Sequence, residues 1–536
     1  MTLGTSRYVP ALCATFAAVS GWICFAADNP PPRVCATCHP KEAARYRQTG
    51  MGQSLIAPAS LPAGRITHPT SDSVITTEQR NGQMFHSLSE RGLTAEYPVR
   101  YQIGGALMGR TYMVQIGSYL FESPVSWFNR HGWDLSPGYT HNPVIDFDRS
   151  MEEQCLFCHT GSAQFIDPDR RRLKDTNLTA ITCGRCHGSG EAHVRHPSSG
   201  NIMNPAKLTS AARDSVCEQC HLEGVDRVLS PGKSWSDFRV GEPTEQTFGT
   251  YFLVGHNGSE VVAVSHVEQL AQSKCAHGSG GKLWCGSCHN PHSQASDRPR
   301  EIRAVCLSCH VALSTKAHPT AQSAVPQECT SCHMPRNAVT DIPHAAITDH
   351  RLLRHPSAAA TSESNEAPKI MIWREGPPAV HDRNFGLAKT VIGFSRNLPD
   401  ISADGIRTLK SLPAGQQNDD PIVLTALEGF ALQSGDTAEA VRIGRHVVEL
   451  QGQSAKAAMN FGIVLKRSGD LTEAERQFQR AIDLNPSLKQ AYIELAQLYA
   501  SQQQMKEVND TIDRFLKWNS QDIMFRLQRS RLGTQP

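Results

Sequence analysis

The sequence predicts a mostly α-helical chain in two parts. The first part should have little regular structure around its functional groups apart from a small inserted β-sheet, and the second should be an all-α solenoid. Three observations predict this. A pattern of two cysteines and a histidine occurs seven times between residues 35 and 333, four β-branched or aromatic runs separate its first two copies, and about 120 C-terminal residues show a 34-residue period.

Length, charge and cysteine count limit the function further. The chain has 536 residues, enough for about three domains. Its 53 basic and 51 acidic residues leave no basic excess, so we expect no nucleic-acid partner. It has 17 cysteines, an odd number that excludes complete disulfide pairing.

Residues 1–26 resemble an export signal. Arg7 precedes an apolar run from Val9 to Phe25, and small residues follow where a peptidase would cut, after Ala26 or Ala27. The alternative is an uncleaved single anchor, which would be the only source of membrane association because no other long apolar run exists. Both alternatives place the bulk of the chain outside the cytoplasm, in the periplasm or the extracellular space.

Fourteen of the cysteines fall into seven C-x-x-C-H motifs, which we number one to seven along the chain. They are Cys35–Cys38–His39, Cys155–Cys158–His159, Cys183–Cys186–His187, Cys217–Cys220–His221, Cys285–Cys288–His289, Cys306–Cys309–His310 and Cys329–Cys332–His333. Each motif is typical of one haem c, with two thiols for the porphyrin edge and the histidine as iron ligand. The sequence therefore predicts seven covalently attached haems.

The motifs fit a zinc site or a redox disulfide less well than haem. A zinc ribbon does not need a histidine after every second cysteine, and redox disulfides do not recur seven times in one chain. Of the three other cysteines, Cys13 and Cys24 belong to the export signal. Cys275 is interpreted as a small packed residue, with reactivity or haem contact as the alternative.

Sixteen further histidines could supply second axial ligands, fourteen of them within the motif-bearing region. His292 follows His289 by three residues, a span of at most about 10 Å. Both rings cannot easily reach opposite faces of one porphyrin, so His292 should bind a neighbouring haem. The same argument applies to His193 and His187.

The motif surroundings resemble a family. The pattern C-x-x-C-H-G-x-G-x-x-H from Cys183, the Pro-His extension after His289, and the segment from His333 to His350 are similar to multihaem cytochromes c related to hydroxylamine oxidoreductase and its tetrahaem acceptor cytochrome. The resemblance covers about residues 34 to 356, and the haem domain is expected at 34–354. It implies second-ligand roles for His193, His292, His344 and His350, and, on weaker matches, His266 and His318. His68 is the first-segment candidate, with His86 as its rival.

Two segments flank or interrupt this haem domain. The insertion at about 68–150 contains the runs Val74 to Thr77, Arg100 to Ile103, Tyr112 to Ile116 and Tyr119 to Phe121, which predict a small antiparallel sheet. We interpret this sheet as a wall over the first haem, or alternatively as a partner or substrate surface. Residues 355–382, rich in Ala, Ser, Thr and Glu at their start, are predicted to be a linker.

The C-terminal segment at 383–534 is predicted to be a tetratricopeptide repeat domain. Gly435 and Gly469 are 34 residues apart, and the repeats are expected at about 421–454, 455–488 and 489–522. Such stacks commonly bind a peptide or helix, so we expect a protein partner here. A spacer or self-association module is the alternative.

The sequence is compatible with three functions. The preferred hypothesis is a periplasmic or exported electron carrier that passes electrons between redox partner proteins and docks through its repeats. The alternative is an oxidoreductase acting on a small nitrogen or sulfur compound at a five-coordinate haem. The ample histidine supply favours the carrier, and no catalytic residue is assigned. A third hypothesis makes the repeats primary, with the haem domain as a module of an assembly.

Overall fold

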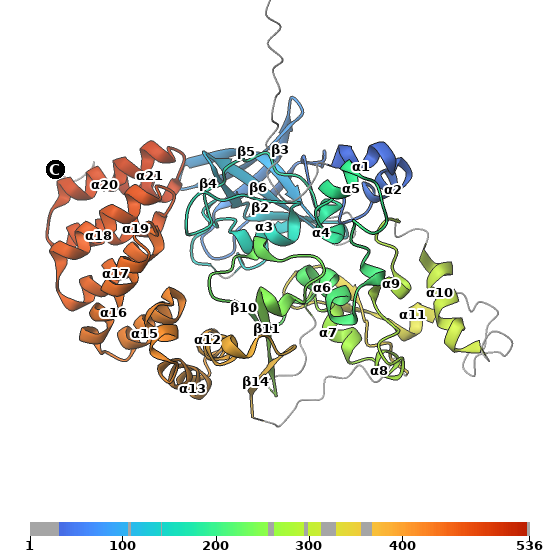
Figure 1. The fold of residues 1–536 in the computed structure, drawn as a ribbon. Helices are drawn as coiled ribbons and strands as arrows, with labels where there is room; N and C mark the ends of the chain where they lie inside the picture. Colours follow the sequence, from blue (N-terminus) through green and yellow to red (C-terminus); the bar gives the residue numbers. More distant parts are fainter. Residues whose placement is uncertain are drawn as a thin grey trace, which may run out of the picture.

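The computed structural model describes residues 32–104, 109–140, 142–255, 262–293, 298–311, 329–354 and 367–532. Figure 1 shows a β-sheet region, a group of short helices beside and below it, and an arc of paired helices whose last members lie next to the sheet. The predicted export signal and His318 lie outside the described residues.

The β-sheet region is one antiparallel sheet of nine strands. Its path runs β2-β3-β4-β5-β6-β8-β9, with β1 paired to β5 and β7 paired to β6. The strands are β1 Leu55–Ile56, β2 Gly64–Thr67, β3 Val74–Arg80, β4 Gln83–Glu90, β5 Leu93–Ile103, β6 Gly109–Ile116, β7 Tyr119–Glu122, β8 Val125–Phe128 and β9 Gly132–Leu135.

This sheet is larger than the small one predicted and begins before residue 68. The four predicted runs fall within β3, β5, β6 and β7. Strand β4 was not predicted. It buries the polar residues His86 and Ser87 among Met84 and Leu88, and this obscures the alternation of apolar and polar residues that marks a strand.

The motif-bearing region consists mainly of short helices joined by irregular segments. All seven C-x-x-C pairs lie in or at the start of such a helix. The helices are α1 Pro32–Cys38, α2 Pro40–Tyr46, α3 Glu153–His159, α4 Gly184–His187, α5 Glu191–Arg195, α6 Ser210–His221, α7 His266–Ala271, α8 Lys274–Gly278, α9 Cys285–Cys288, α10 Arg298–Cys309 and α11 Cys329–His333.

Two small sheets complete this region. One contains β10 Asp226–Leu229, β11 Phe248–Val254 and β14 Lys369–Ile372, and the other pairs β12 Arg336–Ala338 with β13 Ala346–Thr348. Strand β14 lies inside the predicted linker, where the run Lys369–Ile372 pairs with β11. The C-terminal end of that linker is therefore part of the folded structure.

The C-terminal part is all-α, as predicted. Its helices are α12 His381–Ser395, α13 Pro399–Lys410, α14 Ala414–Asn418, α15 Pro421–Gln433, α16 Thr437–Leu450, α17 Ala455–Ser468, α18 Leu471–Leu484, α19 Lys489–Ser501, α20 Met505–Trp518 and α21 Ile523–Leu532. From α15 to α20, corresponding helices start 34 residues apart, which confirms the tetratricopeptide period. Buried residues along the arc form one continuous core.

The helical arc contacts the rest of the chain at both ends (Figure 1). Near its start, Arg383 on α12 donates a 2.5 Å hydrogen bond to the carbonyl of Leu229 on β10. Near its end, Gln521 forms two hydrogen bonds with the backbone of Glu96 on β5, at 2.7 and 2.6 Å. The arc is therefore packed onto the nine-stranded sheet and onto the sheet of β10, β11 and β14, and both contacts are long-range in sequence.

Hydropathy gives one further observation. Within the described ranges, none of the helices has the length and apolar character that crossing a bilayer requires.

Candidate functional site

The motifs share one local geometry that follows from helical turns. In motif one, the amide of His39 donates to the carbonyl of Cys35 at 2.9 Å, and the equivalent bond in motif three joins His187 to Cys183 at 2.9 Å. One helical turn brings the two cysteines to the same side and places the histidine just beyond them. This arrangement lets both thiols and one imidazole address the same bound group.

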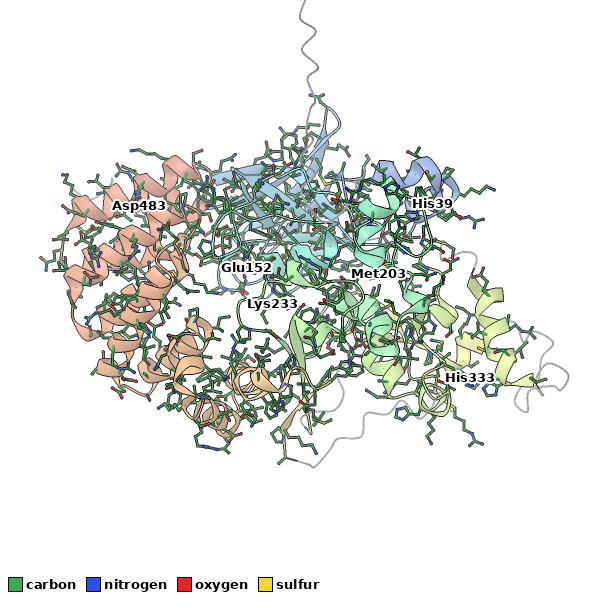
Figure 2. The ribbon with its side chains drawn as sticks, in the orientation of Figure 1. His39, Glu152, Met203, Lys233, His333 and Asp483 are labelled. Carbon is green, nitrogen blue, oxygen red and sulfur yellow. The ribbon has the colours of Figure 1, made fainter. Side chains whose placement is uncertain are left out.

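The seven motifs open into a single cavity of about 4360 Å³. All fourteen motif cysteines and all seven motif histidines line it. Divided equally, each motif has roughly 620 Å³, which is within the ~300–1,000 Å³ typical of one ligand site. Figure 2 labels His39 near α2 and His333 near α11, which belong to the first and last motifs of this lining.

Four second histidines face motif histidines across this cavity. Their ring centres are separated by 6.2 Å for His39–His193, 5.9 Å for His187–His292, 5.8 Å for His221–His266 and 6.1 Å for His289–His350. Two imidazoles bound to opposite sides of one metal ion, each at about 2.1 Å, hold their ring centres about 6 Å apart. The donor set therefore fits a six-coordinate metal at these four motifs.

These rings are oriented by backbone carbonyls. His187 donates from Nδ1 to Met203 at 2.8 Å, and Figure 2 labels Met203 beside this region. His193 donates in the same way to Ser198 at 2.9 Å, His333 to Leu353 at 2.7 Å and His350 to Thr348 at 2.8 Å. The proton on Nδ1 leaves Nε2 as the lone-pair donor, which is the usual arrangement of a histidine that binds a metal.

Burial keeps several of these imidazoles neutral. Desolvation, followed by the nearby His221, lowers the pKa of His159 to about 4. Desolvation, followed by the neighbouring histidines, lowers the pKa of His266 to about 3. A neutral imidazole is the form that binds metal ions, so the surroundings favour ligation over protonation.

Contacts between cysteines show which motifs are neighbours. Adjacent thiols, which shift each other's pKa, join motifs one and three, two and four, four and five, and six and seven. The pairs are Cys35–Cys183, Cys158–Cys220, Cys217–Cys285 and Cys306–Cys329. Electrostatic contacts link motifs three and four through Cys186 and Cys220, and motifs five and six through Cys288 and Cys306. The motifs thus form the series one, three, four, five, six, seven, with motif two attached to motif four.

Two predicted ligands lie elsewhere. His68 is buried beside the large sheet, where Nδ1 contacts Ser71 at 2.7 Å and Nε2 contacts the carbonyl of Tyr139 at 3.1 Å. Its rival His86 is also buried in the sheet, and desolvation lowers its pKa to about 3. Neither lines the cavity, because both rings are packed into the sheet region.

His344 also lies outside the cavity lining, on the segment between β12 and β13. Its Nε2 contacts Asp134 at 2.7 Å, and its ring stacks on His131 with centres 3.6 Å apart. Donor atoms of these three residues lie within 4.8 Å of one another, a cluster that the sequence analysis did not identify. The two rings are nearly parallel, at 6°, so they do not converge on one metal position as they stand.

The unpaired Cys275 is exposed on α8 and lines the same cavity. Its exposure differs from the packed residue expected from sequence. Its place on the cavity lining agrees with the alternative prediction of reactivity or a haem contact.

The comparisons with known proteins found similar solved structures for less than a third of the chain. No protein-family model matches it, and no curated protein does. Among solved structures, the MamA protein is 18% identical over 28% of this chain and 80% of its own, with a TM-score of 0.25. YrrB, described as a TPR protein with an unusual peptide-binding site, is 17% identical over 29% of this chain and 75% of its own, with a TM-score of 0.24. PilF of Pseudomonas aeruginosa is 13% identical over 29% of this chain and 69% of its own, with a TM-score of 0.25.

Proposed function

We propose that the chain is an exported heptahaem cytochrome c that carries electrons between redox partner proteins. One observation carries the proposal. All fourteen motif cysteines and seven motif histidines line one connected cavity, and four further imidazoles face motif histidines at the spacing of a shared metal ion. Bound haem iron would supply the reversible one-electron chemistry.

The residues have separate roles in this proposal. The two cysteines of each motif hold a porphyrin edge, and the motif histidine binds the iron. His193, His292, His266 and His350 act as second ligands for motifs one, three, four and five, in that order. The carbonyls that accept from Nδ1 fix the orientation of these rings and make Nε2 a stronger ligand for iron. These carbonyls would therefore also tune the reduction potentials of the haems.

The order of the motifs supports a carrier. Contacts run without a gap from motif one through three, four, five and six to seven, so successive groups would lie side by side. An electron could then enter near one end of the series and leave near the other. Haem propionates would make the loaded protein anionic, so we expect redox partners with a basic docking face.

The helical arc is proposed to hold the haem region and to bind a protein partner. The first role is supported by its contacts with the nine-stranded sheet and with the sheet of β10, β11 and β14. The second is supported by the tetratricopeptide period, since stacks of this kind offer an extended surface for peptides. Retention of partners by the full-length protein, but not by a variant with altered exposed arc residues, would test it.

Coulometry tests the carrier function. The oxidised holoprotein should accept seven electrons per chain and then reduce an added basic c-type cytochrome, at a rate that falls as salt is raised. Uptake of far fewer electrons, or a reduced protein that transfers none to any cytochrome, would contradict the proposal.

A second candidate function is favoured by one observation. Within the described residues, no other histidine ring lies against His159 of motif two or His310 of motif six, whereas four motif histidines have such a neighbour. An iron without a second protein ligand could bind a small molecule, as an oxidoreductase requires.

A further inference from the structure

Motif two differs from its neighbours in what faces its histidine. The four second imidazoles that line the cavity within the described residues lie beside His39, His187, His221 and His289. His159 shares the cavity with them but has the large sheet as its neighbour. A role for this side of motif two rests on the proposed function.

Hydrogen bonds attach motif two to the sheet. The Ser54 hydroxyl donates to the carbonyl of His159 at 2.8 Å, and the Ser54 carbonyl accepts from Gly104 at 3.2 Å. Ile103, the last residue of β5, directly precedes Gly104 and pairs with Thr111 on β6. These links bring the end of β5 and the start of β6 to motif two.

The wall formed there is polar. Arg110, Thr111, Glu122 and Ser126 come from β6, β7 and β8 and line the same cavity as His159. Glu122 lies close enough to Cys155 to act on it electrostatically, which locates this wall beside the first cysteine of motif two. The hydroxyls of Thr111 and Ser126 are 2.5 Å apart.

Two arginines lie at this wall, and one of them, Arg110, has no carboxylate partner among the described residues. Glu122 is paired with Arg149 at 2.9 Å. Arg110, in contrast, forms no ion pair with any described acidic residue. Its guanidinium lies beside the Tyr112 hydroxyl, but its buried Nε has no hydrogen-bond partner in the described part of the chain. A buried guanidinium donor without a partner is costly, and a small anion would satisfy it.

Motif two also has a defined place among the motifs. Its thiol and imidazole lie against Cys220 and His221 of motif four. Arg185 of motif three also lies close to Cys158 and donates to the carbonyl of Phe157 at 3.0 Å. Motif two therefore lies beside motifs three and four, so an electron could reach a molecule bound there from either of them.

We propose that the iron that motif two would hold can bind a small inorganic anion, and that Arg110 with Thr111 and Ser126 would hold this anion. The ligand class is a small oxyanion or a linear anion of similar size. Motifs three and four connect this position to the electron-carrying series. The carrier and a ligand-binding site would thus share one chain.

Ligand titration of the ferric holoprotein tests this proposal, with azide as the anionic probe and carbon monoxide, after reduction, as the neutral one. Azide should shift the Soret band and convert a high-spin EPR signal to low spin. Arg110→Gln should raise the azide dissociation constant about 10- to 100-fold and leave carbon monoxide affinity within about threefold, because only the anion needs the guanidinium.

The matched control is Arg65→Gln, which removes an exposed guanidinium from β2 and should leave both affinities unchanged. Thr111→Val is a second variant that keeps the side-chain shape and should weaken azide about three- to tenfold. Azide affinity that is equal in wild type, Arg110→Gln and Thr111→Val would overturn the assignment.

Haem content separates the two proposals. A protein with seven haems, only low-spin signals and no binding of either probe overturns this inference and leaves the carrier function intact. A protein without covalent haem overturns both.

Discussion

A histidine can bind a metal ion only if one of its ring nitrogens is not already engaged in a hydrogen bond within the protein. His193 and His292 could be predicted from sequence, since each lies too close along the chain to its own motif histidine, and the structure places them beside His39 and His187. The position of His68 outside the cavity lining could not be predicted from sequence. Its ring is satisfied by Ser71 and by the Tyr139 carbonyl, and a contact 71 residues away leaves no local pattern.

Removing one second ligand should open one iron. His193→Ala deletes the imidazole opposite His39, so we expect one additional high-spin ferric signal and one additional carbon monoxide site in the reduced protein. EPR integration and gas titration measure both. His196→Ala is the control, because His196 is exposed and three residues away. Identical spectra for the two variants would contradict the pairing of His39 with His193.

At the scale of elements, periodicity predicted the helices better than the strands. Helices α15 to α20 repeat every 34 residues, and this period is visible in sequence. The large sheet was underestimated although the Asn81-Gly82 pair between β3 and β4, with φ of 50° and 80°, is a strong hairpin signal. Its pairing of β1 with β5 spans a long stretch of chain and cannot be deduced from local residues.

Helix α15 carries a buried acid that should make stability depend on pH. Burial raises the pKa of Glu428 to about 7, and its Oε1 has no described hydrogen-bond partner. Because the unfolded state loses this proton near pH 4.3, wild-type stability should fall between about pH 4.3 and 7, by about 4 kcal/mol.

Glu428→Gln should lack this fall, so the variant should gain stability relative to wild type as pH rises from 4.5 to 8. Denaturant unfolding at several pH values measures the difference. Glu449→Gln, at an exposed position on α16, provides the control. A constant difference between Glu428→Gln and wild type across this range would show that Glu428 does not titrate as described.

The whole molecule is organised by contacts between the helical arc and the sheets. Sequence alone predicted two separate parts and a linker, because the residues that join them are far apart in the chain. Lys489 on α19 contacts Asp146, and its Nζ lies 2.9 Å from Asp522. Trp518 on α20 packs against Tyr119 and Phe121 of β7. The arc and the large sheet therefore share one interface.

Breaking the charge cluster at this interface should destabilise the molecule. Lys489→Met leaves Asp146 and Asp522 buried without their cation, which should cost about 3–5 kcal/mol at pH 8. The loss should be smaller at pH 5, since desolvation already raises the pKa of Asp146 to about 7 and protonation removes its charge. Thermal unfolding at both pH values tests this.

Lys456→Met, at an exposed position on α17, is the matched control and should change the midpoint little. Equal midpoints for Lys489→Met and Lys456→Met would argue against a structural role for the buried cluster.

The central claim is that the seven motifs hold seven covalently attached haems, and the most direct test is the intact mass of the exported holoprotein after acid unfolding. Thioether bonds survive unfolding, whereas zinc and non-covalent haem are lost. The account predicts the mass of the chain without its export signal plus seven haems. A mass equal to the polypeptide alone, with fourteen motif thiols free to react, would contradict it.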